Sequence, residues 1–118
     1  MNREILFRGK RVDNGKWTEG YLFKIWHKVF LLWGMTGDIP NMEEVKPETV
    51  GQFTGLCDKN GRKIFEGDIV ESPNGTQGFI EWQNAECAFL VNIGDDWQTM
   101  DDCTYEVVGN IYDNGEEE

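Results

Sequence analysis

The sequence predicts a small, mainly β protein with little helix. Gly and Asn recur about every eight to twelve residues, and aromatic or β-branched residues fill the intervals between them. No window keeps apolar residues at helical spacing over several turns. The length of 118 residues suits one domain with a modest core. We therefore expect short antiparallel strands, divided into an N-terminal β part over 1–62 and a second β part over 63–113.

The N-terminal part begins with a predicted strand over residues 5–9 and a turn over 13–15. Residues 17–30 follow as a hairpin or one long strand rich in aromatic side chains. Gly, Asp, Pro and Asn then come in quick succession over 34–47, a composition typical of loops. We predict a loop there, with one helical turn at 41–45.

An Asn-Gly pair predicts a hairpin in the middle of the chain. The apolar run 49–56 and the apolar run 64–70 flank a polar turn that contains Asn60 and Gly61. Asn and Gly accept the positive φ that a tight hairpin turn requires. We therefore expect Gly61 at positive φ.

The C-terminal half contains about five predicted strands, at 63–65, 68–71, 78–82, 88–93 and 105–112. Five short strands with tight turns are enough for a small barrel, which removes the exposed edges of a sheet. We expect an SH3-like barrel over 63–113, with the N-terminal part as an additional, irregular β-layer. Residues 114–118 read as a solvated acidic tail.

Five segments resemble one protein family in order and spacing. They are Phe7-Arg8-Gly9-Lys10-Arg11, Asp13-Asn14-Gly15-Lys16-Trp17, 49–56, 66–70 and Val108-Gly109-Asn110-Ile111-Tyr112. Together they span almost the whole chain, which resembles the YopX family of phage and prophage proteins. The resemblance implies a single domain over 1–118 and a phage or prophage origin, and it names no reaction. Region 94–104 departs from the family pattern.

The charge is segregated along the chain, whose net charge is −11. Residues 1–30 carry seven Lys or Arg against three acids, whereas after Lys63 fourteen acids follow without a base. Such a chain favours partners of opposite sign, including a second copy of itself. We expect a homo-oligomer in which Arg3, Arg8 or Arg11 meets carboxylates from 66–102 of a neighbour. A host or phage protein is the other expected partner.

The basic N-terminal residues also form the one nucleic-acid footprint in the sequence. Arg3, Arg8, Lys10 and Arg11 alternate with aromatic residues such as Trp17, on which bases could stack. The acidic remainder of the chain repels a polyanion, so we expect no nucleic-acid partner. Two alternatives stay open: a nucleic-acid-binding protein that uses these strands, and an acidic decoy for a basic host protein.

The densest acidic cluster surrounds a tryptophan. Asp95, Asp96, Asp101 and Asp102 flank Trp97. An exposed Trp97 would mark a binding surface with a charged rim, whereas a buried one would fill the core, which is the role we favour. A solvated loop explains the carboxylates better than a metal site does.

The residues that could carry catalysis are few and scattered. His27 is the only histidine, and Cys57, Cys87 and Cys103 are widely spaced. We interpret the cysteines as reduced thiols, and we expect no metal, no cofactor and no catalytic residue. The longest apolar runs are also far too short for a membrane span. The sequence thus predicts a non-enzymatic binding module of the cytosol, and the family resemblance implies that this is the cytosol of a bacterium.

Overall fold

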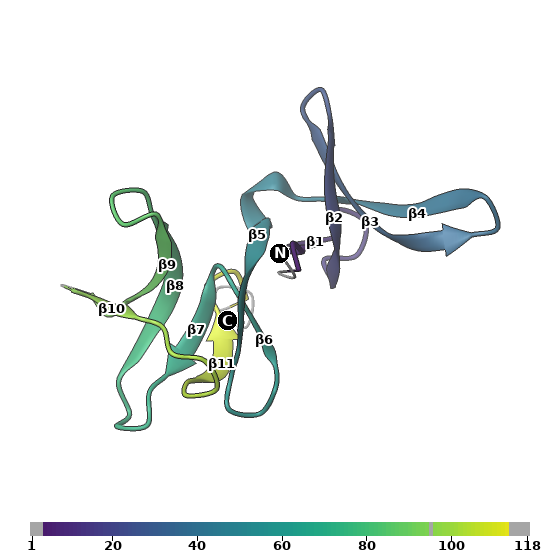
Figure 1. Cartoon of the computed structure of the whole chain (residues 1–118). Coiled ribbons are helices and arrows are strands. Elements are labelled where there is room, and N and C mark those ends of the chain that lie inside the picture. The colour runs from purple at the N-terminus through teal and green to yellow at the C-terminus, as the bar shows by residue number, and fades with distance from the viewer. Residues whose placement is uncertain (1–3, 95, 114–118) are drawn as a thin grey trace. The chain divides into compact units, whose positions relative to one another are not determined.

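The computed structural model describes residues 4–94 and 96–113, which form eleven strands and one short 3-10 helix (Figure 1). The prediction of a mainly β protein with little helix is confirmed. The chain divides into two compact units, 1–53 and 54–118, and strand β5 crosses the boundary. The predicted acidic tail 114–118 lies outside the described residues.

The strands are short, and the longest are β2 and β3. In chain order they are β1 (Phe7–Lys10), β2 (Trp17–Ile25), β3 (Lys28–Thr36), β4 (Ile39–Val45), β5 (Gly51–Cys57), β6 (Lys63–Phe65), β7 (Asp68–Glu71), β8 (Gln77–Gln83), β9 (Ala88–Asn92), β10 (Trp97–Thr99) and β11 (Glu106–Asn110). The 3-10 helix η1 (Pro47–Thr49) joins β4 to β5. This helix is too short to cross a membrane, and the described residues form no helix that could.

The first unit is built on an antiparallel sheet in the order β4-β3-β2-β1-β5. Its small core consists of Val29, Leu31 and Val45, against which Phe7 and Val50 pack. Gly9 faces this core so closely that an added Cβ would lie 3.1 Å from the Cβ of Val45. A side chain at this position would therefore push β1 away from β4.

The loop predicted over 34–47 is wrong, because most of that segment is strand. A two-residue turn at Gly37 and Asp38 joins β3 to β4, and Gly37 adopts a φ of 64°. Thr36 and Ile39 pair directly across the turn. A glycine-containing two-residue turn is a hairpin signal, and the surrounding Pro40 and Asn41 obscured it. The one helical turn lies at Pro47–Thr49 instead of 41–45.

A short hydrogen-bond chain holds η1 against β1. The Lys10 N–H donates to Thr49 Oγ1 over 2.9 Å, and this hydroxyl donates to the Lys46 carbonyl over 2.7 Å. The Lys46 N–H returns to the Lys10 carbonyl over 2.8 Å. The N–H and the carbonyl of Lys10, at the end of β1, are therefore both hydrogen-bonded. The hydroxyl of Thr49 accepts the first of these bonds and donates its own to Lys46.

The second unit contains the antiparallel sheet β10-β9-β8-β7-β11. Its core is larger than that of the first unit and consists of Ile64, Val70, Ile80, Val91, Tyr105 and Val107. The predicted strands 63–65 and 68–71 have the observed bounds, and those over 78–82, 88–93 and 105–112 differ from β8, β9 and β11 by at most two residues at each end. Strand β10 was not predicted.

The expected SH3-like barrel is not confirmed. Within the described residues, β10 and β11 are the outer strands of an open sheet and do not pair with each other. Strand β6, which we expected in the barrel, pairs beside β5. Closure of a sheet needs its two outer strands to pair with each other, whereas β10 has only three residues, all of them exposed.

The hairpin predicted at Asn60 and Gly61 is confirmed, with Gly61 at a φ of 84°. The carboxylate of Asp58 organises this turn by accepting the N–H groups of Asn60 over 2.9 Å, Arg62 over 2.8 Å and Val107 over 3.0 Å. Burial raises the pKa of Asp58, but the three backbone hydrogen bonds outweigh it, so the pKa lies below its ordinary value. This buried side chain thereby joins the hairpin to β11.

Candidate protein-binding surface

Two hairpin ends of the first unit are exposed. The first end, residues 21–28, is where β2 turns into β3, and the second end, residues 33–42, is where β3 turns into β4. Figure 1 shows the two hairpins projecting in different directions. All of residues 21–28 and 33–40 are exposed. We call these segments the first and second hairpin ends.

Large apolar side chains dominate both hairpin ends. Their exposed fractions are Tyr21 63%, Leu22 38%, Phe23 42%, Ile25 37%, Trp26 90%, Trp33 53%, Met35 61%, Ile39 70% and Met42 44%. Single exposed apolar residues are ordinary on a protein surface, but a large set on one structural element marks an interaction site or an aggregation hazard. The hairpin ends therefore form the candidate site.

Strand pairing explains why one face of this sheet lacks a cover. Directly opposed residues of antiparallel strands share a face. On one face, Val29 lies between Lys24 and Val45, both Val29 and Val45 are buried, and this face holds the core. On the other face, Leu32 lies between Tyr21 and Met42, which are exposed. The sheet is thus apolar on both faces but covered on one.

Trp26 is the most exposed large apolar residue of the described chain, at 90%. It lies in the two-residue turn between β2 and β3 and has a φ of 56°. A bulky residue in this left-handed region is strained, since its Cβ crowds the backbone. The side chain adds almost no packing within the chain to offset that strain. Strained residues of this kind occur at functional sites.

The two hairpin ends carry opposite charge. The first contains Lys24 and Lys28 and no acid, whereas the second contains Asp38 and no base. All three charged residues are exposed. Charges of this kind around an apolar patch form the polar rim that protein interfaces have.

The second hairpin end also includes part of an outer strand. Among the described residues, β4 pairs with β3 along its length and lies at the end of the strand order. On its other side, the Val12 N–H donates to the Glu44 carbonyl over 2.9 Å. The preceding residues 39–43 have no such strand beside them within the described chain. An outer strand with exposed apolar residues is a site for pairing with another polypeptide.

The basic residues predicted as a nucleic-acid footprint do not form an exposed row. Arg8 is 8% exposed and Lys10 is 1% exposed. The guanidinium carbon of Arg8 lies 4.6 Å from the ring centre of Trp17, and the Lys10 ammonium lies 5.5 Å from it. The structure thus brings these three predicted residues together as a buried cation–π cluster. Arg3 lies outside the described residues.

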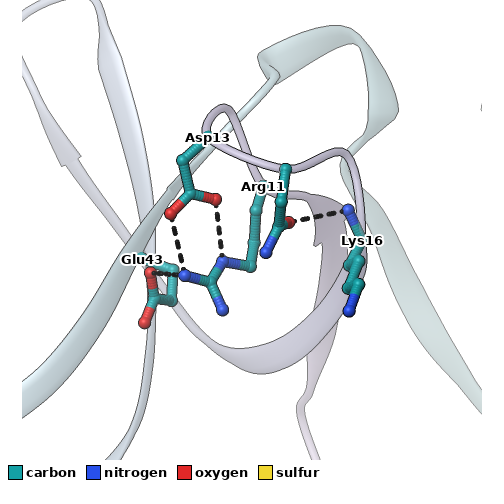
Figure 2. A network of polar contacts seen from close by, with 5 residues as sticks. Arg11, Asp13, Lys16 and Glu43 are labelled. Atoms are coloured by element: carbon teal, nitrogen blue, oxygen red, sulfur yellow. Dashed lines mark hydrogen bonds and ion pairs between the residues drawn. The ribbon is translucent and has the colours of Figure 1, made fainter.

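Arg11 is paired within its own unit (Figure 2). Its guanidinium makes a bidentate contact with Asp13, at 3.1 and 2.9 Å, and lies 3.0 Å from Glu43. The hydrogen bond from Arg11 lowers the pKa of Asp13. This ion pair supports the turn after β1 and connects it to β4. It also shows that Arg11 already has acidic partners, which we had expected from a neighbouring molecule.

The predicted acidic cluster is dispersed into turns. Asp96 accepts the Trp97 N–H over 2.8 Å, and Asp102 accepts the Cys57 N–H over 3.0 Å. Asp101 is exposed, and Asp95 lies outside the described residues. No group of three or more His, Cys, Asp or Glu in the described chain is arranged to hold a metal ion.

Trp97 is exposed rather than buried. It is 44% exposed, and its indole N–H donates to Glu81 over 3.2 Å. The core role that we favoured is wrong, because β10 is an outer strand whose residues all face solvent. Trp97 therefore remains a candidate contact residue, on the second unit.

The sequence contained a signal for the hairpin ends. Residues 21–23, 25–26 and 29–33 are apolar at neighbouring positions, not only at alternate ones. A strand that is apolar on both faces is usually covered on both. The N-terminal part of this chain has too few residues for two covering layers. The sequence thus implied that something outside the sheet covers one face.

Comparison with known proteins gives one family and one fold. The family model described as YopX protein matches residues 6–117. The crystal structure of protein EF1440 from Enterococcus faecalis is similar, with a TM-score of 0.55 and 22% identity, covering 98% of this chain and 99% of that one. At this identity, the likeness supports the fold alone. None of the curated proteins matches the chain.

Proposed function

The chain belongs to the YopX protein family, and we propose that it acts as a non-enzymatic protein-binding module. We further propose that it is phage- or prophage-encoded and works in the bacterial cytosol, as expected from the sequence. The observation that carries the binding role is the pair of exposed apolar hairpin ends, with Trp26 at a φ of 56°. Tryptophan is among the residues that contribute most to protein interfaces.

The ionisable groups support a binding role better than a catalytic one. Asp13 and Asp58 have lowered pKa values because hydrogen bonds hold their carboxylates in turns. The negative charge of Asp102 raises the pKa of the exposed Cys103 thiol, which disfavours the nucleophilic thiolate. Tyr105 has a pKa raised by burial and by Asp101. Each shift follows from a structural contact, and the contact between Asp102 and Cys103 keeps the thiol protonated instead of activating it.

A pocket among the described residues of the second unit is small and polar for a substrate site. It has a volume of about 210 Å³ and is lined by Lys59, Glu71, Ser72, Pro73, Thr104 and Glu106. Ligand sites are usually larger, at roughly 300–1,000 Å³, and mostly apolar. Lys59 lies 3.4 Å from Glu106, so its charge already has a partner.

The alternative of nucleic-acid binding is less well supported. Such a site needs cations at the surface that neutralise phosphates and displace counterions. Burial of Arg8 and Lys10 on Trp17 counts against this use of the basic strand. The two hairpin ends carry Lys24 and Lys28 as their basic residues, and two positive charges give weak affinity for a polyanion.

A photo-crosslinking residue tests the proposed function. We would replace Trp26 by benzoylphenylalanine, express the chain in a bacterial host, irradiate the cells and identify adducts by mass spectrometry. We expect covalent adducts to polypeptides, because Trp26 extends into solvent at a binding surface. Ile111, 41% exposed on the second unit, is the control position and should give few adducts.

The absence of protein adducts at position 26 would contradict the proposed function. So would an equal yield from positions 26 and 111, because the hairpin end would then show no preference for protein partners over the second unit. The same irradiation in the presence of added nucleic acid, followed by nuclease treatment, tests the alternative. Adducts that disappear on nuclease treatment would favour nucleic-acid binding.

A further inference from the structure

We propose that the hairpin ends bind a second copy of this chain, with the first hairpin end of each subunit against the second hairpin end of the other. This inference rests on the proposed function and names the partner. Three features of the described residues carry it: the exposed apolar area, the charges of the two ends and the outer edge of β4.

The exposed apolar area is of the size that a stable interface needs. Nine large apolar side chains on the two ends are between 37% and 90% exposed. At about 200 Å² for a large side chain, they expose roughly 1,000 Å² in sum. A standard interface buries about 800 Å² on each partner, and contact at both hairpin ends would supply an area of this order. A partner of this chain's own size can cover such an area.

The charges favour unlike ends in contact. The first end has Lys24 and Lys28, and the second has Asp38. Two identical ends would bring like charges together, whereas unlike ends bring Lys28 of one subunit towards Asp38 of the other. In a two-fold arrangement this contact occurs twice, as an isologous interface requires.

The outer edge of β4 provides backbone groups to the same interface. Residues 39–43 lie at the end of the strand order in the described chain. A strand from a second subunit would pair with this edge and cover Ile39, which is 70% exposed. The contact is therefore mainly apolar, unlike the Arg-to-carboxylate contact expected from the sequence. Burial of Arg8 and the pairing of Arg11 with Asp13 and Glu43 remove the basis of that earlier expectation.

Sedimentation of the purified full chain tests this inference. We expect a concentration-dependent species of twice the 13.6 kDa monomer mass. It should persist at high salt, because an apolar contact survives a screening length of about 3 Å at 1 M salt. A chain that stays monomeric at high protein concentration, or a dimer that dissociates on adding salt, would overturn the inference.

Two variants locate the interface, and a third serves as the matched control. Trp26→Asn and Ile39→Asp should each raise the dimer Kd by about tenfold or more, as loss of a central contact does. Ile111→Asp introduces the same change at an exposed isoleucine of the second unit and should leave Kd unchanged. A circular dichroism spectrum like that of the unaltered chain shows that each variant is folded. Equal effects of Ile39→Asp and Ile111→Asp would exclude the hairpin ends as the interface.

A charge exchange tests the pairing of unlike ends. Lys28→Asp alone should weaken association, and adding Asp38→Lys to the same chain should restore most of it. Loss without restoration would contradict the pairing of these ends. The failure of this inference can be distinguished from the failure of the proposed function. A monomeric chain whose position 26 cross-links only to other proteins would contradict a second copy as the partner, but it would still support the proposed protein-binding role.

Discussion

The two units of this protein distribute apolar side chains in opposite ways. In the second unit, six large apolar residues of the sheet and its flanks gather in one buried core. In the first unit, the described core cluster has three buried residues, and Leu6 and Phe53 are buried outside it. Nine large apolar residues are exposed on its hairpin ends, against four exposed in the described part of the second unit. The units also differ in charge, at +1 for residues 1–53 with eight bases and seven acids, and −12 for residues 54–118 with three bases and fifteen acids.

This contrast indicates a division of roles. A unit that buries its apolar residues and carries a high charge of one sign is well suited to remain soluble. A nearly neutral unit with uncovered apolar strands is suited to contact another protein. We therefore propose that the second unit contributes most of the stability of the chain and that the first presents the binding surface. Substitutions that separate stability from association test this division.

The largest expected effect comes from a matched pair of isoleucines. Ile80 is 1% exposed in the core of the second unit, and Ile39 is 70% exposed on the second hairpin end. Ile80→Ala should lower the free energy of unfolding by about 2–5 kcal/mol, because it removes buried methyl groups and leaves a cavity. Ile39→Ala should lower it by less than about 1 kcal/mol. Urea denaturation of both variants measures the difference, and similar losses would contradict the division of roles.

A smaller effect is expected at the buried carboxylate of the second unit. Asp58→Ala leaves the N–H groups of Asn60, Arg62 and Val107 without their acceptor. We expect a loss of about 2–4 kcal/mol, since three hydrogen bonds of about 1 kcal/mol each disappear and one buried donor stays unpaired. Denaturation by urea at neutral pH measures it.

The pH dependence of that loss follows from the sign of the pKa shift. The pKa of Asp58 in the folded chain lies below its ordinary value of 3.8. Its contribution to stability is therefore complete above that ordinary value and disappears as the pH falls through the lower, folded value. The stability difference between the unaltered chain and Asp58→Ala should narrow in acid. A difference that stays constant down to the acid transition would show that the carboxylate charge is not involved.

Much of the second unit could be predicted from sequence because its turns have local signals. The Asn60-Gly61 pair predicts the tight turn of a hairpin, and the alternating runs around Val70 and Ile80 predict strands. Closure into a barrel depends on contacts between distant strands, which no local pattern contains. The role of Asp58 was missed for the same reason, since its third partner, Val107, is far away in the sequence.

The candidate site was harder to predict than the fold. Arg8, Lys10 and Trp17 were singled out as exposed residues, but their cross-strand positions on β1 and β2 bury the two cations on the indole. Exposure depends on what covers a sheet, and the sequence of a strand does not contain that information. The turn at Trp26 also lacks the Gly or Asn that signals a tight turn. The turn was therefore missed, although Trp26 is the most exposed large apolar residue of the site.

The smallest expected effect concerns that turn, and it has the opposite sign. Trp26 has a φ of 56° and is 90% exposed, so its side chain makes almost no packing contacts that would offset the backbone strain. Asn tolerates the left-handed region and keeps less freedom in the unfolded chain than Gly does. Trp26→Asn should therefore raise the free energy of unfolding by about 0.5–1 kcal/mol, in the same chain whose association it weakens.

Measurement of both properties on one variant separates function from folding. Urea denaturation at a protein concentration below the dimer Kd gives the stability of the monomer, free of the contribution of association. Trp26→Ala is the control, because it removes the same side chain but keeps a Cβ in the strained region, and it should gain less stability than Trp26→Asn. If Trp26→Asn destabilised the monomer, the tryptophan would be a folding residue, and its exposed position would no longer argue for a partner.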